Sequence, residues 1–333
     1  MKKHYFFIAL LLAKTFVLGA CGSSSSPKEE NNNTEAANET DNSKETKIVT
    51  YLGKDYEVPV DPQKILVVAP EGMEELEKLG VKPYAVGKDV YDEKDIPEEM
   101  AKMFENVEYI DVGYYPDKEA LLELSPDLIL STNRLAPEEL KPMEEIAPTF
   151  PLSYDGADTI ANITVVGEIL NKQDEASQAI KEYEEKLAAA KEKIANSDLK
   201  DKIVLYMRLS SSNGITIYND SITYNSILYN ELGFKAPEVL TKVERLEEFP
   251  LEKLAELNPD YIFVLMYETE TGTDKEDKAY EELAKNPLWQ KIAAVQNDNV
   301  SMNIISPYYF GVPVFSKELF LDKAMEVFEE DMK

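Results

Sequence analysis

The chain has 333 residues, of which 44% are hydrophobic, and this is enough apolar material for two domains with their own cores. Its formal net charge of −29 disfavours a nucleic-acid partner, because such partners require a basic surface. The only histidine is His4 and the only cysteine is Cys21, so histidine-based catalytic triads, disulfides and zinc sites with nitrogen or sulfur ligands are excluded beyond residue 21.

The start of the chain, residues 1–20, has the pattern of a secretory signal peptide. Basic residues precede an apolar run at 5–13, which is too short for a permanent membrane helix and is followed by Lys14. Small residues then lead to Cys21, and Leu-Gly-Ala-Cys has the form of a bacterial lipoprotein box. We therefore predict a lipoprotein signal peptide at 1–20 and a lipid-modified Cys21. An ordinary signal peptide with an incidental cysteine is the alternative.

Residues 22–46 are almost entirely Ser, Asn, Glu, Thr and Lys. A segment with so few apolar side chains cannot offset the entropy lost on ordering. This predicts a disordered tether at 21–46 that begins at the lipidated cysteine. Such an anchor would hold the folded part at the extracytoplasmic face of the cell membrane, in the manner of a Gram-positive lipoprotein.

The folded part is predicted to begin with an α/β lobe at 47–158. A buried strand and an amphipathic helix come first, and Gly80 ends the helix. A later helix ends at the corner Ser-Pro126-Asp127, because proline stops a helix, and the apolar run after it suits a strand covered on both faces. The expected elements are strands at 61–69, 84–87, 128–132 and 146–152, and helices at 71–80, at 96–104 and from Pro137.

Helical sequence over 159–200 is predicted to connect this lobe to the next. The stretch 175–195 is rich in Ala, Glu, Lys and Leu and contains no Gly or Pro, as expected for a rigid helix. A helix packed within one lobe is the alternative. Most of the acids of the chain are expected to form solvated helix faces.

A second α/β lobe is predicted at 201–333. The corner pattern returns as Asn-Pro259-Asp260 followed by Tyr-Ile-Phe-Val-Leu, 133 positions after the first corner. Two such corners in matching surroundings predict two similar lobes, and a cleft between two lobes is a natural ligand site. The other expected elements are strands at 202–209 and 299–304 and helices at 226–232, 287–295 and 315–332.

Arginine is rare in this chain and occurs only as Arg134, Arg208 and Arg245. Arg134 follows the strand of the first corner, and Arg208 lies near the end of the first strand of the second lobe. Ligands of α/β sheets bind at the carboxyl ends of strands, and guanidinium combines a planar fork of donors with stacking on aromatic rings. We therefore predict that Arg208 and Arg134 contact ligand, with ordinary surface arginines as the alternative.

Tyrosines gather in the same connections. A tyrosine in a loop offers a flat apolar ring and one hydroxyl, which suits a rigid organic ligand, although any single one is more often a packing residue. Tyr154 and Phe310 belong to this group. The predicted contacts are Tyr114, Tyr115, Tyr218, Tyr224, Tyr267, Tyr308 and Tyr309.

Several of these features occur together in one known family. The lipoprotein box at Cys21, the paired Pro-Asp corners, the long helix and Asn286-Pro-Leu-Trp289-Gln-Lys-Ile-Ala-Ala-Val make the chain resemble the siderophore-binding lipoproteins of bacterial ABC importers. The resemblance is strongest to FeuA-type ferric catecholate-siderophore binding proteins, of the class III periplasmic-binding-protein-like family, and it covers the whole chain beyond the signal peptide. It implies two Rossmann-like α/β lobes joined by one long helix, little closure on the ligand, and delivery of the ligand to a permease.

The resemblance also implies site residues. FeuA-type proteins hold a trianionic ferric catecholate with basic residues, and their Arg-x-Arg strand corresponds to Tyr206-Met-Arg208 here, so only the second arginine is retained. Because tyrosine replaces part of the positive charge, a less charged hydroxamate or citrate-type complex is also possible as ligand. The siderophore supplies the oxygen ligands of Fe(III), so no metal ligand or cofactor is expected from the protein. Other basic positions of the family correspond to Lys88, to Arg134 and to the neighbourhood of Tyr114 and Tyr115.

The family presents one glutamate of each lobe to arginines of its permease. The matching positions here are Glu138 and Glu247, with the neighbours Glu139 and Glu248 as alternatives. An acid at a helix start also stabilises the helix dipole, which is the competing explanation. The symmetric placement in the two lobes favours docking to the transmembrane subunits.

The leading hypothesis is a monomeric substrate-binding lipoprotein of an ABC transporter, not an enzyme, that captures a ferric siderophore. One alternative is a haem or corrinoid-binding lipoprotein, since tyrosine can ligate haem iron; a Soret band after haem addition would favour it. Another is a lipid-anchored hydrolase with paired carboxylates, although no pair stands out in the sequence. Turnover of a glycan or ester would favour the hydrolase.

Overall fold

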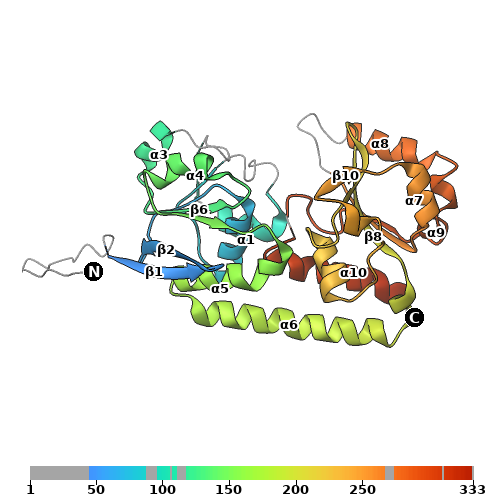
Figure 1. The fold of residues 1–333 in the computed structure, drawn as a ribbon, viewed down its shortest axis with the longest axis horizontal. Helices are drawn as coiled ribbons and strands as arrows, with labels where there is room; N and C mark the ends of the chain where they lie inside the picture. Colours follow the sequence, from blue (N-terminus) through green and yellow to red (C-terminus); the bar gives the residue numbers. More distant parts are fainter. Residues whose placement is uncertain are drawn as a thin grey trace, which may run out of the picture. The chain divides into compact units, whose positions relative to one another are not determined.

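The computed structural model describes residues 45–87, 96–105, 107–110, 118–266, 274–309 and 311–331, and all of these belong to one compact unit. Within these ranges, no helix is both long enough and apolar enough to cross a membrane. The described residues form two five-stranded sheets, each with its own helices, and a separate two-stranded hairpin (Figure 1). We call the region of the first five-stranded sheet the first lobe and the region of the other the second lobe.

The sheet of the first lobe has the order β5-β4-β3-β6-β7, and all of its strand pairs are parallel. Its central strands are fully buried, which explains why their sequence is a continuous apolar run rather than an alternating one. The strands are β3 (Ile65–Val67), β4 (Ala85–Gly87), β5 (Glu108–Ile110), β6 (Leu128–Thr132) and β7 (Thr149–Leu152), and the helices between them are α1 (Pro70–Leu79), η3 (Glu98–Met100), α2 (Ala101–Phe104), α3 (Lys118–Leu124) and α4 (Pro137–Glu144).

The sheet of the second lobe has the order β10-β9-β8-β11-β12 and is mixed. The pairs β8–β11 and β11–β12 are parallel, whereas β8–β9 and β9–β10 are antiparallel. The strands are β8 (Val204–Ser210), β9 (Gly214–Tyr218), β10 (Leu246–Glu248), β11 (Tyr261–Leu265) and β12 (Val300–Met302). The helical segments are η6 (Ser226–Glu231), η7 (Leu240–Lys242), α7 (Leu251–Leu257), α8 (Asp274–Ala284), η8 (Trp289–Lys291) and α9 (Ala293–Gln296).

The two Pro-Asp corners have the same structural role. The Asp127 carboxylate accepts hydrogen bonds from the backbone N–H groups of Gln63 and Lys64, at 2.7 and 2.9 Å. The Asp260 carboxylate accepts one from the N–H of Ile203, at 2.9 Å. In each lobe the corner therefore satisfies the N–H groups at the entry of the neighbouring central strand, where no ladder partner precedes them. The repeated sequence pattern therefore corresponds to the same hydrogen-bonding arrangement in both lobes.

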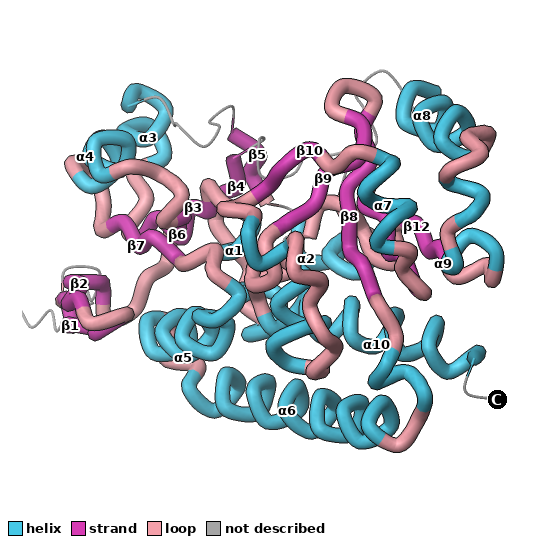
Figure 2. The backbone as a smooth tube through the Cα atoms, turned by 45° about the vertical axis from the view of Figure 1, so that its right-hand side comes forward, coloured by secondary structure: helices cyan, strands magenta, loops and turns pink. Residues whose placement is uncertain are grey.

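Three long helices lie outside the sheets: α5 (Thr159–Ile169), α6 (Gln173–Ala195) and α10 (Val314–Asp331). Helix α6 packs against α5 and α1 near the first lobe and against α10, the final helix of the chain. Figures 1 and 2 show α6 running beside α5 and α10 along one side of the unit. The expected fold, two Rossmann-like α/β lobes joined by one long helix, is confirmed.

Local differences from the sequence expectations are few. The helix expected at 96–104 is a 3-10 turn followed by a short α-helix, and the one expected at 226–232 is π-helical over Ser226–Glu231. Strand β10 and the hairpin of β1 (Thr46–Tyr51) and β2 (Lys54–Pro59) were not expected as strands. An isolated two-stranded ribbon is only marginally stable. Here Tyr51 anchors the hairpin, because its ring packs on Phe150 of β7.

Candidate functional site

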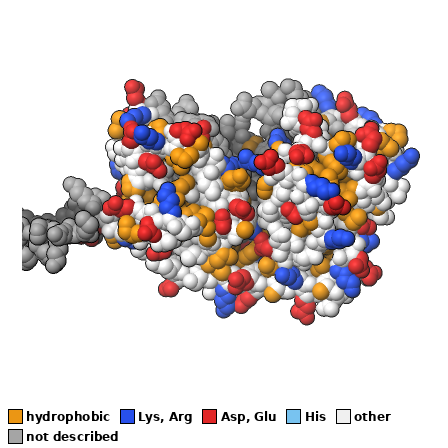
Figure 3. Space-filling view, viewed as in Figure 1, with side chains coloured by type: hydrophobic (Ala, Val, Ile, Leu, Met, Phe, Trp, Pro, Cys, Tyr) orange, Lys and Arg blue, Asp and Glu red, His pale blue; other side chains and the backbone are white. Residues whose placement is uncertain are grey.

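One cavity of about 330 Å³ takes its lining from both lobes. All three arginines of the chain lie in its wall, although the chain is strongly acidic. Four tyrosines line it as well, together with apolar residues and one threonine. Figure 3 shows the hollow between the lobes, with basic and acidic side chains near its rim. The arginines and tyrosines of this site, which we call the inter-lobe cavity, are Arg134, Arg208, Arg245, Tyr154, Tyr206, Tyr218 and Tyr309.

The strand ends explain where Arg134 and Arg208 lie. Arg134 follows the carboxyl end of β6, and Arg208 lies near the carboxyl end of β8, where it is opposite Leu265 of the parallel strand β11. Arg245 directly precedes the edge strand β10, so it lies at the amino end of that strand and this rule does not account for it. Parallel strands bring their carboxyl ends to one edge of the sheet, so these ends form the walls of the cavity.

The guanidinium of Arg134 is held by the first lobe. Its Nη2 lies 2.9 Å from Oε1 and 3.1 Å from Oε2 of Glu71, and its Nε donates to Oγ1 of Thr132 at 3.2 Å. Glu71 lies in the first turn of α1 and is 0% exposed. Burial raises the pKa of Glu71, and the adjacent Arg134 limits the rise. The pair is therefore a buried carboxylate behind a cation that lines the cavity.

A cation–π contact joins the two lobes at the cavity. The Arg245 guanidinium carbon, from the second lobe, lies 5.0 Å from the centre of the Tyr154 ring, which follows β7 in the first lobe. Because Arg245 is exposed and Tyr154 is half-buried, we expect this contact to contribute about 0.5–1 kcal/mol. Neither residue was among the predicted contacts. Tyr154 belonged to the tyrosine group, and the signal for Arg245 was the rarity of arginine itself.

Tyrosines form the rest of the wall. The rings of Tyr206 on β8 and Tyr218 on β9 stack with their centres 5.7 Å apart. The hydroxyl of Tyr309 donates to Oε2 of Glu99 at 3.2 Å. Burial and neighbouring carboxylates, Glu99 first among them, raise the pKa of Tyr309, so its hydroxyl remains a hydrogen-bond donor at neutral pH.

Not every predicted contact lies in this wall. Tyr218 and Tyr309 line the inter-lobe cavity, as Arg134 and Arg208 do, whereas Tyr224 and Tyr308 are not among its lining residues. The Tyr224 ring is buried and stacks on Phe320 at 4.4 Å between ring centres, so it is a core residue. Tyr308 is partly buried against the core. The predicted positions Cys21, Lys88, Tyr114, Tyr115 and Tyr267 lie outside the described residues.

The two glutamates predicted to dock a permease are both exposed. Glu138 lies in the first turn of α4, where its neighbour Glu139 accepts a hydrogen bond from the backbone N–H of Ala136 at 2.7 Å and so closes the start of the helix. This leaves Glu138 as the side chain directed to solvent. In the second lobe, β10 presents both Glu247 and Glu248 to solvent.

Helix α1 buries two more glutamates behind Glu71, at positions 74 and 75, against the expectation of solvated acids. Neither carboxylate oxygen of Glu75 has a hydrogen-bond partner among the described residues. Burial, and to a smaller extent the charges of Glu74 and Glu71, raise the pKa of Glu75 well above its ordinary value. Glu75 is therefore protonated in the folded protein at pH values where it is ionised in the unfolded chain.

This pKa difference makes the free energy of unfolding depend on pH. The folded state binds the extra proton, so the contribution of Glu75 is full below its unfolded-state pKa and is lost as pH rises toward its folded-state pKa. We expect Glu75→Gln to remove this loss. The free energy of unfolding of the variant, relative to that of wild type, should therefore increase by about 1.4 kcal/mol for each pH unit across that window. Urea unfolding from pH 4 to pH 8 measures it. Glu123→Gln, exposed on α3, is the control, and equal slopes for wild type and Glu75→Gln would contradict the expectation.

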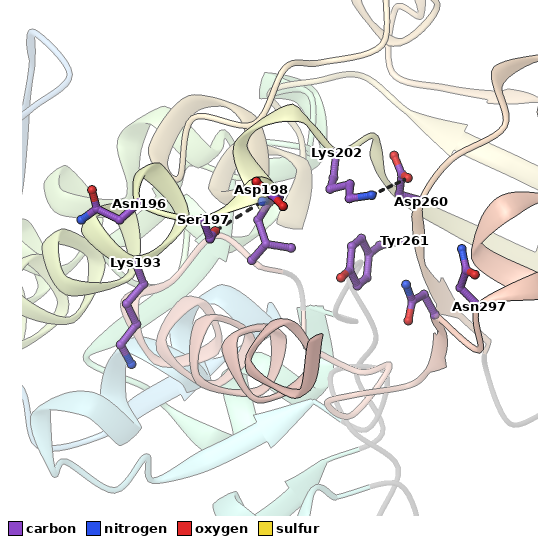
Figure 4. A pocket seen from close by; sticks show the side chains of 10 residues that line it. Lys193, Asn196, Ser197, Asp198, Lys202, Asp260, Tyr261 and Asn297 are labelled. Carbon is purple, nitrogen blue, oxygen red and sulfur yellow. Dashed lines mark hydrogen bonds and ion pairs between the residues drawn. The ribbon is translucent and has the colours of Figure 1, made fainter. Parts of the chain in front are cut away.

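A larger cavity, of about 860 Å³, lies in the second lobe at the end of α6 (Figure 4). Its wall is formed at the amino ends of β8 and β11, the edge of the sheet opposite the inter-lobe cavity. The charged residues Lys202 and Asp260 pair with each other there at 3.2 Å. Because ligands of such sheets bind at the carboxyl ends of the strands, we assign no function to this cavity.

Comparisons with known proteins agree with this architecture. The family model described as Periplasmic binding protein matches residues 65–302. The Iron-uptake system-binding protein of Bacillus subtilis (strain 168) is 34% identical over 326 residues, which cover 96% of each chain. The Probable siderophore-binding lipoprotein YfiY of the same organism is 27% identical and covers 90% of each chain. The crystal structure of the triscatecholate siderophore binding protein FeuA from Bacillus subtilis with ferri-bacillibactin has a TM-score of 0.76 and 32% identity, over 85% of this chain and 98% of that one.

Proposed function

Because the chain belongs to the Periplasmic binding protein family, we propose that it is the substrate-binding protein of an ABC importer and captures a ferric siderophore in the inter-lobe cavity. The observation that carries this proposal is the convergence of all three arginines of an acidic chain on one cavity that both lobes line. A ferric siderophore is a rigid organic cage, often anionic, and guanidinium groups with flanking phenol rings suit such a ligand.

In this proposal the iron is cargo, and the siderophore supplies its oxygen ligands. The protein binds the outer surface of the complex, so it acts as a monomeric carrier and catalyses no reaction. Arg208 and Arg134 provide charge on opposite walls, and Arg245 with Tyr154 completes the wall where the lobes touch. The ligand class is a catecholate complex or a less charged hydroxamate or citrate-type complex.

Titration of the purified protein with a panel of ferric complexes tests the proposal. We expect ferric triscatecholates, hydroxamates or citrate-hydroxamates to quench the intrinsic fluorescence saturably, and the iron-free siderophores to bind more weakly. Haemin belongs in the same panel, because a Soret band without any response to ferric siderophores would support the haem alternative. If no ferric siderophore bound, the proposal would be wrong.

The membrane anchor is part of the same proposal. Residues 1–20 would be removed and Cys21 lipidated, and the tether at 21–46 would hold the lobes at 47–158 and 201–333, joined by 159–200, at the extracytoplasmic face. Relatives with lipoprotein names support this. We expect metabolic labelling with palmitate to mark the wild-type protein and not Cys21→Ser, which should appear in the culture medium. Equal labelling of the two would contradict the anchor.

Delivery to the permease is proposed to use Glu138 and Glu247. We expect Glu138→Gln and Glu247→Gln each to reduce uptake of the ferric siderophore by cells, because each removes a charge from a contact with a permease arginine. Ligand affinity of the purified variants should remain that of wild type. Glu144→Gln on α4 and Glu252→Gln on α7 are exposed controls in the same lobes. Uptake at the wild-type rate in the double variant would remove both residues from the docking surface.

A further inference from the structure

A buried carboxylate behind the wall of the inter-lobe cavity works against an anionic ligand. Glu71 is completely buried, and its carboxylate is in direct contact with the Arg134 guanidinium at 2.9 and 3.1 Å. Arg134 itself lines the inter-lobe cavity and has a side chain that is 16% exposed. A bound complex that touches Arg134 therefore lies close to the Glu71 carboxylate, with the guanidinium between them.

The position of Glu71 favours its charged form in two ways, although burial raises its pKa. Glu71 lies in the first turn of α1, where the helix dipole stabilises an anion. Thr132, at the end of β6, holds the other side of the same guanidinium through Oγ1 at 3.2 Å from Nε. Glu71 and Thr132 both therefore orient the Arg134 guanidinium. The Glu71 carboxylate also offsets the positive charge of Arg134.

We propose that Glu71 is a specificity-determining residue of the inter-lobe cavity: it orients Arg134 and offsets one positive charge, which lowers the preference for trianionic complexes relative to uncharged ones. This inference rests on the function proposed above. The reason is electrostatic, because repulsion from a fixed carboxylate grows in proportion to the negative charge of the ligand. A ferric triscatecholate carries three negative charges and a ferric trihydroxamate carries none, so the carboxylate penalises the first and not the second.

The two effects of Glu71 can be measured separately. Glu71→Gln removes the charge and keeps a carbonyl that can accept from Arg134, whereas Glu71→Met removes both the charge and the acceptor at similar volume. The ratio of the affinities for a ferric triscatecholate and an uncharged ferric trihydroxamate reports the charge. The loss that is common to both ligands reports the orientation of Arg134. Titrations are run at slightly alkaline pH, because burial raises the pKa of Glu71.

We expect the affinity ratio to shift toward the triscatecholate by about tenfold or more in both variants, since both remove the same charge. Glu71→Met should in addition lose affinity for both ligands. Glu144→Gln, an exposed acid of the same lobe, should leave the ratio at the wild-type value. Circular dichroism checks that each variant is folded. If one of the two does not fold, the other still measures the effect of removing the charge.

Three outcomes overturn the inference. A ratio within twofold of wild type in both variants would show that the ligand does not sense the Glu71 charge. A shift in Glu71→Gln without one in Glu71→Met would assign the effect to side-chain shape instead of charge. Binding of neither complex to the wild-type protein would overturn this inference, and the proposed function would be wrong as well only if the citrate-hydroxamates of the panel also failed to bind.

Discussion

Replacing Lys317 with alanine is expected to lower the free energy of unfolding by about 3–5 kcal/mol, because it removes one partner of a buried ion pair. Lys317 lies on α10 with 1% of its side chain exposed. Its Nζ donates to the backbone carbonyl of Gly156 at 2.9 Å and to the Glu231 carboxylate, which also accepts from the Tyr183 hydroxyl. The substitution would leave the partly buried Glu231 charge without its cation and the Gly156 carbonyl without its donor.

The consequence extends to the arrangement of the lobes. Gly156 belongs to the end of the first lobe, Glu231 to the π-helical segment of the second, and Tyr183 to the connecting helix α6. Loss of the Lys317 cation therefore loosens the junction where these three elements meet α10, and we expect faster hydrogen exchange there.

Urea unfolding followed by circular dichroism measures the effect of Lys317→Ala. Lys323→Ala is the matched control on the same helix, because Lys323 forms only an exposed pair with Glu326 and should cost less than about 0.5 kcal/mol. The double variant Lys317→Met with Glu231→Leu should recover part of the loss, because it leaves no charge unpartnered. A Lys317→Ala protein as stable as the control would show that the pair contributes nothing to the junction.

Replacing Arg208 with alanine is expected to weaken binding of an anionic ferric siderophore by about 2 kcal/mol or more, which is a loss of about thirtyfold or more in affinity. Arg208 lies near the carboxyl end of β8 and lines the inter-lobe cavity. The alanine variant would leave the negative charge of the ligand without this cation in the inter-lobe cavity. Fluorescence titration or calorimetry with the tightest ferric complex of the panel measures the change.

Two further variants separate charge from geometry at this position. Arg208→Lys keeps the charge and loses the planar fork, so it should fall between wild type and alanine. Lys242→Ala, at an exposed lysine of the second lobe that pairs with Glu238, should leave the affinity unchanged. Equal affinities for wild type and Arg208→Ala would exclude Arg208 from the ligand site.

The sequence by itself determined the elements whose formation is local. Proline at the two corners ends a helix wherever it stands, and the apolar runs that follow become the buried strands β6 and β11. The stretch without Gly or Pro becomes the single helix α6, two residues longer at its start than expected. Strand ends also placed one arginine in each lobe, Arg134 and Arg208, at the carboxyl edge of its sheet, because the direction of a parallel strand fixes which of its ends meets the cleft.

Only the tertiary structure decided which distant side chains meet. Glu71 and Arg134 come from different elements, and Arg245 and Tyr154 come from different lobes, so no local pattern relates them. Most acids of the chain are expected on solvated helix faces, yet α1 packs against α5, α6 and α10 as well as the sheet, and this buries Glu71, Glu74 and Glu75. Helical periodicity records which side chains share a face, but only the packing of the other elements determines which faces lose contact with water.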